Sequence, residues 1–393
     1  MIAERELSTS EATLRLKKLC QRLSLNPKIS YQGNHKLVAT CSLQSRSGEN
    51  ASSGAGKGQH SGLGAIAESL EHYFLDHGAA DQTHITSGEC VHACAQGHDD
   101  WILNSVPTSI RLSSFRMEAL ESNSSIYVPS ILLNPTLQYI KELQGTEGEF
   151  LTKYSSNSGM ALGCTENEAL LHAINECIER HALSIYYLSI CKLIPAPKLM
   201  KPSHALLKET FSDNDVLFSY SQDLSIYMLT DFYGLFFCVA IGAPEQDISL
   251  AVIGSGCSAS PNVALYRAVT EQVQCARLRG DREKDEDHET ARMLSTSTRL
   301  SSLLYPITKG EAGQVNPLPF GGNLREQIQQ TTAHLKAHGR SIFYRTLFNE
   351  PGLACVVQAY IPGLERFHLI RSGFPVVPQS VLSQGSRNPH VYL

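Results

Sequence analysis

The sequence contains no apolar run long enough to cross a lipid bilayer. Its longest, Leu235–Ala243, falls well short of the roughly 20 residues that a membrane-spanning helix needs. Residues Met1–Ser10 are polar and acidic, without the apolar centre of a secretory signal peptide. These absences predict a cytoplasmic protein with no membrane partner.

Runs of basic residues are also missing. The 393 residues hold 33 Lys and Arg against 38 Asp and Glu, which gives a formal net charge of -5. That balance argues against nucleic acid as a partner. The densest charged stretch, Arg277–Glu289, mixes both signs and is typical of a solvated helix end or loop.

The eleven cysteines show no repeated spacing. Most have apolar neighbours, as Cys238 does, which predicts buried thiols in the reduced state. One local cluster could bind zinc, but its spacing does not match a standard finger, and we do not expect zinc there. Its members are Cys90, His92, Cys94 and His98.

One pattern is present three times. A Gly/Ser-rich segment, expected to be a loop, precedes a helix-compatible stretch with two acid or amide side chains three residues apart. The copies are 52–58 with Glu68 and Glu71, 158–163 with Glu176 and Glu179, and 254–257 with Glu271 and Gln274. Residues three apart share a helix face, so each pair can direct two oxygens at one point. Oxygen ligands suit Mg2+, and Gly-rich backbone can approach phosphate. The repetition predicts a nucleotide held through several metal ions.

A plainer interpretation exists for each part of this pattern. An isolated Glu-x-x-Glu is more often a solvated helix face, and Lys57 in Gly56-Lys57-Gly58 could be an exposed turn lysine, since no Ser or Thr follows to make a Walker A motif. Three copies in one chain favour the functional interpretation.

Predicted helices and strands alternate without a long linker. Caps and apolar stripes predict helices over 11–24, 64–77, 165–188, 262–279 and 324–338. β-rich runs predict strands over 38–43, 126–133, 216–243 with breaks at 221–223 and 233–234, 249–253, 341–347 and 354–361. Residues 80–125 show no clear pattern. We expect a mixed α/β fold with one interwoven catalytic domain, because the three units must converge on one site.

Four blocks of sequence resemble motifs of the YcaO family. Residues 156–165 running into Glu176–Arg180 resemble its central motif, and Gly56–Gly58 with Glu68–Glu71 is similar to its N-terminal one. Residues 264–283 resemble the third motif and Ile361–Glu365 a C-terminal landmark. Each block alone is weak, but the four in this order, spanning 52–365, are specific.

The resemblance implies a YcaO-like catalytic domain over 51–380, after an N-terminal region over 1–50 and before a tail over 381–393. It implies an ATP site between acidic helices and β-sheets, in an enzyme that phosphorylates the oxygen of a peptide backbone amide. Carried over by position, the Mg2+ ligands are Glu68, Glu71, Glu176, Glu179 and Glu271, and the nucleotide contacts are Lys57, Ser158, Arg180, Arg267 and Gln274. Arg180 and Arg267 would also offset charge during phosphoryl transfer. No side chain stands out as the general base.

The resemblance leaves several reactions open. A Cys, Ser or Thr nucleophile gives an azoline in a ribosomally synthesised precursor peptide, which is the first expectation; its partner would be a ThiF-like peptide-recognition protein. Thioamide formation with a TfuA-type partner is the second, and an amidine is a third product of the same chemistry. A non-catalytic ATP-binding scaffold is disfavoured, because clustered acids without metal would repel. A homodimer is compatible with the sequence.

The sequence departs from the family pattern at two places: the first would weaken a phosphate contact or alter packing, and the second bears on this choice. His72 stands where the family often has Arg after the second Glu, and the last residues contain one proline, Pro389, rather than a Pro-rich tail. We therefore expect that the tail does not supply the catalytic base. This expectation favours thioamide formation relative to azoline formation.

Overall fold

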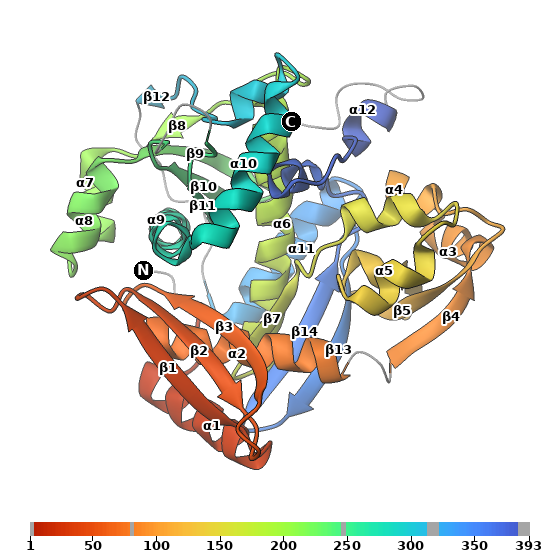
Figure 1. Ribbon diagram of the computed structural model, residues 1–393, viewed down its shortest axis with the longest axis horizontal. Coiled ribbons are helices and arrows are strands. Elements are labelled where there is room, and N and C mark those ends of the chain that lie inside the picture. The colour runs from red at the N-terminus through yellow and green to blue at the C-terminus, as the bar shows by residue number, and fades with distance from the viewer. Residues whose placement is uncertain (1–3, 79–81, 245–248, 313–321, 384–393) are drawn as a thin grey trace.

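A computed structural model describes residues 4–78, 82–244, 249–312 and 322–383 and places three β-sheets around one long helix, α6 (Glu166–Ile190) (Figure 1). Each of the three Gly-rich segments lies in a different sheet. The predicted C-terminal tail falls almost wholly outside the described residues. Among those residues, no helix has the length and apolar character needed to span a membrane.

The first sheet has the order β1–β2–β3 and is antiparallel. Helices α1 and α2 pack against it (Figure 1). The elements are α1 (Thr9–Arg22), β1 (Asn26–Gln32), β2 (Val38–Gln44), β3 (Asn50–Lys57) and α2 (Ser61–Gly78).

The second sheet has the order β4–β5–β13–β14–β7, with β6 paired to β5, and α6 packs on β14 and β7. Its strands are β4 (Thr83–Ser87), β5 (Arg111–Ala119), β6 (Ser125–Pro129), β7 (Met160–Gly163), β13 (Phe343–Glu350) and β14 (Ala354–Tyr360). Three helices lie between these strands in sequence: α3 (Gly88–Ala95), α4 (Trp101–Asn104) and α5 (Leu137–Leu143).

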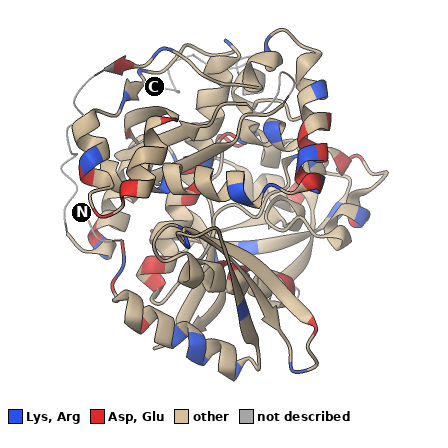
Figure 2. Ribbon diagram, turned by 60° about the vertical axis from the view of Figure 1, so that its left-hand side comes forward, with Lys and Arg blue, Asp and Glu red and all other residues tan. Residues whose placement is uncertain are grey.

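The third sheet has the order β11–β10–β9–β8–β12, and α9 packs on β10 and β11. Its strands are β8 (Met200–Lys201), β9 (Ser225–Phe232), β10 (Leu235–Ile241), β11 (Ile253–Ser258) and β12 (Glu311–Ala312). The other helices of the C-terminal half are α7 (His204–Thr210), α8 (Asp215–Gln222), α9 (Pro261–Leu278), α10 (Asp281–Ser295), α11 (Leu324–Ala337) and α12 (Gln379–Ser383). Charges of both signs alternate along α10, where Figure 2 shows red and blue side by side.

The Gly-rich segments are strands, so the prediction of loops was wrong. Gly56 on β3, Gly163 at the end of β7 and Gly254 on β11 each face the helix that follows. A Cβ on Gly56 would lie 1.8 Å from the carbonyl oxygen of Ser61, and one on Gly254 would lie 2.2 Å from the backbone nitrogen of Gln272. The glycines therefore let each acidic helix pack directly on its strand, a close approach that no other residue permits.

Several predicted elements differ in detail. Residues 215–222 form helix α8 instead of a strand, because the Asn214 side chain caps its N-terminus by accepting from the N–H of Leu217. The strand expected over 249–253 begins only at Ile253, and the one expected over 126–133 ends at Pro129 and continues as a 3-10 turn.

Helix α6 begins where its capping signal predicts. Thr165 is the N-cap, and its hydroxyl accepts from the N–H of Glu168. The Glu168 carboxylate does not return to Thr165 but accepts from the N–H groups of Cys164 and Glu6, at 2.9 and 2.6 Å. The N-terminal segment is thereby fastened to the start of α6.

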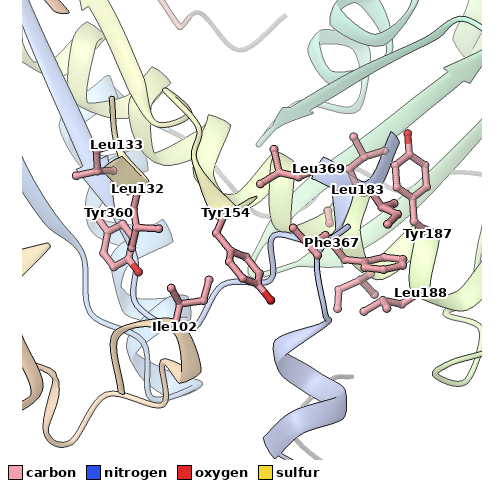
Figure 3. Close-up of a cluster of buried hydrophobic side chains, with 14 of the residues drawn as sticks. Ile102, Leu132, Leu133, Tyr154, Leu183, Tyr187, Leu188, Tyr360, Phe367 and Leu369 are labelled. Atoms are coloured by element: carbon pink, nitrogen blue, oxygen red, sulfur yellow. The ribbon is translucent and has the colours of Figure 1, made fainter. Parts of the chain in front are cut away.

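The C-terminal half of α6 packs in a large apolar cluster (Figure 3). Leu183, Tyr187 and Leu188 of α6 pack there with Phe367 and Leu369 of the 3-10 helix Phe367–Ser372. Full burial of such side chains contributes about 1.5–3 kcal/mol each. This core fixes α6 and the chain that follows β14 relative to each other.

The eleven cysteines are all free, and seven of them are buried, in agreement with the predicted reduced thiols.

Candidate active site

The three acidic helices turn their carboxylates toward one cavity of about 660 Å3. Its walls include nine of the ten residues that the sequence singled out: Lys57, Glu68, Glu71, Glu176, Glu179, Arg180, Arg267, Glu271 and Gln274. They come from α2, α6 and α9 and from the end of β3, which are far apart in sequence. The tenth, Ser158, lines a smaller adjoining cavity that shares Arg180.

Each Gly-rich strand and the acidic helix that follows it form one unit: β3 with α2, β7 with α6, and β11 with α9. Each unit contacts a carboxylate of another unit, and the three contacts form a closed circuit. Glu71 of α2 accepts from the N–H of Leu162 on β7 at 2.6 Å. Glu179 of α6 accepts from the hydroxyl of Ser255 on β11 at 2.6 Å. Glu271 of α9 pairs with the ammonium of Lys57 on β3 at 2.5 Å. The first unit thus contacts the second, the second the third and the third the first, which fixes the separation of the acid pairs.

Arg180 lies at the centre of the carboxylates. Its guanidinium nitrogens are 3.6 Å from Glu176, 3.8 Å from Glu179 and 3.9 Å from Glu271. These are loose ion pairs rather than a tight bidentate one, so the cation can also face an anion in the cavity.

Arg267 is engaged differently. One terminal nitrogen lies 2.6 Å from the Glu4 carboxylate and 2.9 Å from Nδ1 of His172, and the other donates to the carbonyl of Cys257 at 2.8 Å. Arg267 lines the cavity, but part of its charge is already offset by Glu4.

Burial perturbs the acids of the site. Removal from water, with the neighbouring Glu68 and Glu176 charges, raises the pKa of Glu71 to about 8. Burial likewise raises the pKa of Glu176 to about 7, even though Arg180 opposes the shift. Burial disfavours the ionised form of Glu271 as well, but Lys57 and Arg180 outweigh it and hold its pKa below the usual value. Burial raises the pKa of Glu68 as well, so three carboxyls of the site lack enough positive charge near them.

This deficit fits Mg2+, which commonly binds one or two carboxylates together with phosphate oxygens. Within residues 4–78, 82–244, 249–312 and 322–383, no three His, Cys, Asp or Glu side chains are gathered closely enough to form a complete metal site. Carboxylates around a cavity, rather than a closed cage, suit a metal that arrives with a nucleotide. Glu68, Glu71, Glu176, Glu179 and Glu271 are the residues that could hold it.

Asn175 is a site residue that the sequence analysis did not identify. It is 3% exposed and lines the cavity, and neither its amide oxygen nor its amide nitrogen has a partner among the described residues. A buried amide without partners costs about 1–3 kcal/mol, which a ligand in the cavity would offset. The sequence did contain a signal for this residue: Asn175 is one helical turn from His172 and from Glu179, so it lies on the same helix face as the predicted ligand Glu179.

Other missed residues had no signal in the sequence. Arg5 and Leu7 line the cavity because the N-terminal segment crosses to α6, and Asn157 does so from the turn before β7. His72, by contrast, was noted in the sequence as a departure from the family pattern; it lines the cavity too, with Nδ1 2.7 Å from the Ser53 carbonyl.

A protein-family model described as the ATP- and Mg2+-binding YcaO cyclodehydratase matches residues 54–365. Among curated proteins, an uncharacterised protein of Methanothermobacter thermautotrophicus is 25% identical over 232 residues, which cover 54% of this chain and 56% of that protein.

Two solved structures share the fold over more than nine-tenths of this chain. A heterocyclase in complex with substrate and cofactor has a TM-score of 0.63 at 16% identity, covering 93% of this chain and 54% of its own. YcaO from Methanopyrus kandleri, bound with AMPPCP and Mg2+, has a TM-score of 0.61 at 16% identity, covering 92% of both chains.

The E. coli microcin synthetase McbBCD complex contains a chain with a TM-score of 0.54 at 15% identity, covering 86% of this chain and 88% of that one.

The present chain spans only about half the length of the heterocyclase and of the curated relative. Because the family model covers most of its length, the chain belongs to the YcaO family, and its cofactors are ATP and Mg2+.

Proposed function

We propose that this protein uses ATP to phosphorylate the oxygen of a peptide backbone amide, and that it thereby closes Cys, Ser or Thr residues of a ribosomally synthesised precursor peptide into azolines. The observation that carries the proposal is the cavity in which carboxylates from the three helices α2, α6 and α9 lie around Arg180 and Lys57. The family and the heterocyclase-like fold support the reaction class.

The chemistry explains why such a cavity is needed. An amide oxygen is a poor leaving group and phosphate is a good one. Phosphoryl transfer depends chiefly on charge neutralisation and alignment of the reacting atoms. Bound Mg2+ would supply part of that neutralisation.

The chain's own residues supply the rest. Arg180 faces the cavity from among three carboxylates, where it can meet negative charge that develops on the transferred group. Lys57, paired with Glu271, holds a second positive charge at the end of β3. The orphaned amide of Asn175 offers both a donor and an acceptor for orientation.

Thioamide formation is the second candidate. Both reactions share the ATP step, so they differ in nucleophile and partner. A peptide-recognition protein of the ThiF-like kind fits the first and a TfuA-type protein the second.

The test is the mass of a candidate precursor peptide after incubation with the protein, ATP and Mg2+. Loss of ~18 Da indicates ring closure and gain of ~16 Da indicates exchange of oxygen for sulfur, as the two net reactions require. Glu179→Ala and a reaction without ATP are the controls. ATP consumption with no change in peptide mass, for every candidate tried with its partner protein, would contradict the proposal.

A further inference from the structure

The smaller cavity beside the main one contains a proton acceptor that the proposed reaction lacks. It has a volume of about 30 Å3, room for about one water molecule, and it is lined by Ser158, Arg180, Tyr360, Glu365 and His368 among others. Because Arg180 lines both cavities, the smaller one adjoins the site of phosphoryl transfer. A nucleophile that attacks the amide beside this cavity must lose a proton.

The hydrogen bonds of Ser184 determine the tautomer of His368. The Ser184 hydroxyl lies 2.8 Å from the carbonyl oxygen of Arg180 and 3.2 Å from that of Glu365, and both oxygens can only accept. We assign the single Ser184 proton to the Arg180 carbonyl, because this is the shortest of the three contacts and because the assignment lets every neighbour that can donate do so. Nδ1 of His368, 3.1 Å from the same hydroxyl, must donate to it, and the backbone N–H of His368 donates as well, at 2.9 Å.

With its proton on Nδ1, the imidazole keeps a lone pair on Nε2. That nitrogen accepts no hydrogen bond from the described residues, and the half-buried ring lines the cavity. Burial, together with the positive charges of Arg180 and Arg366 and the neighbouring His181, keeps the pKa of His368 well below its usual value. The ring is therefore neutral at physiological pH.

The other titratable groups that line the cavity are already occupied. The Glu365 carboxylate accepts from the backbone N–H groups of Arg366 and Ser380 at 2.9 and 3.0 Å. The Cys177 thiol donates to the carbonyl of Ala359, and burial raises its pKa to about 12. The Tyr360 hydroxyl donates to the Asp100 carboxylate at 2.7 Å.

We propose that His368 is the catalytic base, whose Nε2 takes the proton from the nucleophile as that nucleophile attacks the amide carbon. This inference rests on the proposed function. In the azoline reaction the S–H or O–H bond breaks as the new bond to carbon forms, and the amide oxygen takes the terminal phosphoryl group of ATP. Loss of the N–H proton then forms the C=N bond and releases phosphate. Of the two protons lost, one leaves on hydrogen phosphate and the other reaches solvent through His368.

The decisive variant is His368→Asn. The Asn side-chain amide can still donate to Ser184 as Nδ1–H does, but it has no group equivalent to Nε2. We expect kcat for peptide conversion to fall by about 10²–10⁴-fold, the usual contribution of a general base. The affinity for Mg2+ with a non-hydrolysable ATP analogue and the melting temperature should stay close to wild type. His35→Asn, in an exposed loop, is the matched control.

The pH profile provides a readout that a purely structural residue would not alter. A base must be neutral to act, so wild-type kcat should fall as the pH drops through the pKa of His368, and the residual rate of His368→Asn should lack that limb. A folded His368→Asn protein that converts peptide at the wild-type rate overturns the role of His368 alone. A wild-type protein that converts no peptide overturns the proposed function, and the inference with it.

Discussion

Arg180 is the residue on which the charges of the site converge, since three carboxylates lie within 4 Å of its guanidinium. We expect Arg180→Ala to lower kcat by about 10²-fold or more, the scale of losing one contact to developing charge. The measurement is ADP release in the presence of peptide. Arg282→Ala, on the exposed face of α10, is the control and should retain the wild-type rate. Near-normal turnover in Arg180→Ala would remove Arg180 from the mechanism.

Glu71 makes the stability of the metal-free protein depend on pH. Its pKa rises from 4.5 to about 8 on folding, chiefly because of burial, so the folded state binds the extra proton between these values. Stability should therefore decrease as the pH rises from 4.5 to 8. Thermal melts across this range, with a chelator present, measure the effect.

The matched variant for this prediction is Glu71→Gln, which resembles the protonated acid. It should show a smaller decrease in melting temperature over the same range, and added Mg2+ should reduce the decrease in the wild type. Equal pH dependence in the variant and the wild type would assign the effect to other groups.

At the scale of the element, the glycines of β3, β7 and β11 set the distance between each strand and its helix. Gly56→Ala would place a Cβ 1.8 Å from one backbone atom of α2 and 2.4 Å from another, and backbone cannot move aside as a flexible side chain can. Such overpacking typically costs about 1–3 kcal/mol.

We expect Gly56→Ala to lower the melting temperature and to weaken nucleotide binding by displacing Glu68 and Glu71. Gly78→Ala, at the end of the same helix, is the control, because its Cβ would meet its nearest neighbour at an ordinary 3.4 Å. Both quantities can be followed by thermal melts with and without Mg2+ and ATP. An unchanged melting temperature for Gly56→Ala would show that α2 is not held by this contact.

The sequence predicted the acidic helices well because their signals are local. Thr165 caps α6, and the pairs Glu68/Glu71 and Glu176/Glu179 follow from helical periodicity. The Gly-rich strands were mistaken for loops because glycine has the same local preference whether it serves a turn or a close approach of backbone. Only the packing of the helix on the strand distinguishes the two.

The contacts of the site could not be predicted, because they depend on pairs of residues remote in sequence. Lys57 and Glu271 are 214 positions apart, and Glu4 and Ser258 are 254 apart. His368 could not be predicted either, because its proposed role as the base depends on contacts with the Ser184 hydroxyl and two carbonyl oxygens and not on a sequence motif. The orphaned amide of Asn175 is likewise visible only once its surroundings are known.

At the scale of the whole molecule, the circuit of contacts among the three sheets makes the site a shared property of the fold. Glu71 is held by β7, Glu179 by β11 and Glu271 by β3. Residues 4–7 add a further link, because Glu4 contacts Ser258 and Arg267 while the backbone of Glu6 contacts Glu168. A ligand in the cavity therefore stabilises all three units at once.

Hydrogen exchange should reveal this coupling. A non-hydrolysable ATP analogue with Mg2+ at 100 times its Kd stabilises the bound state by about 2.7 kcal/mol. We expect slower exchange in β3 and α2, in β7 and α6, and in β11 and α9 together, because each carries residues that line the cavity or hold those that do. Helix α10, which lies outside the cavity lining and is largely exposed in its N-terminal half, is the internal control and should not change. The same nucleotide with a chelator should protect these segments less, since Glu71 and Glu176 would keep their unfavourable charge environment. Protection confined to one of the three units would mean that the nucleotide binds a single helix and strand, and that the circuit plays no part in forming the site.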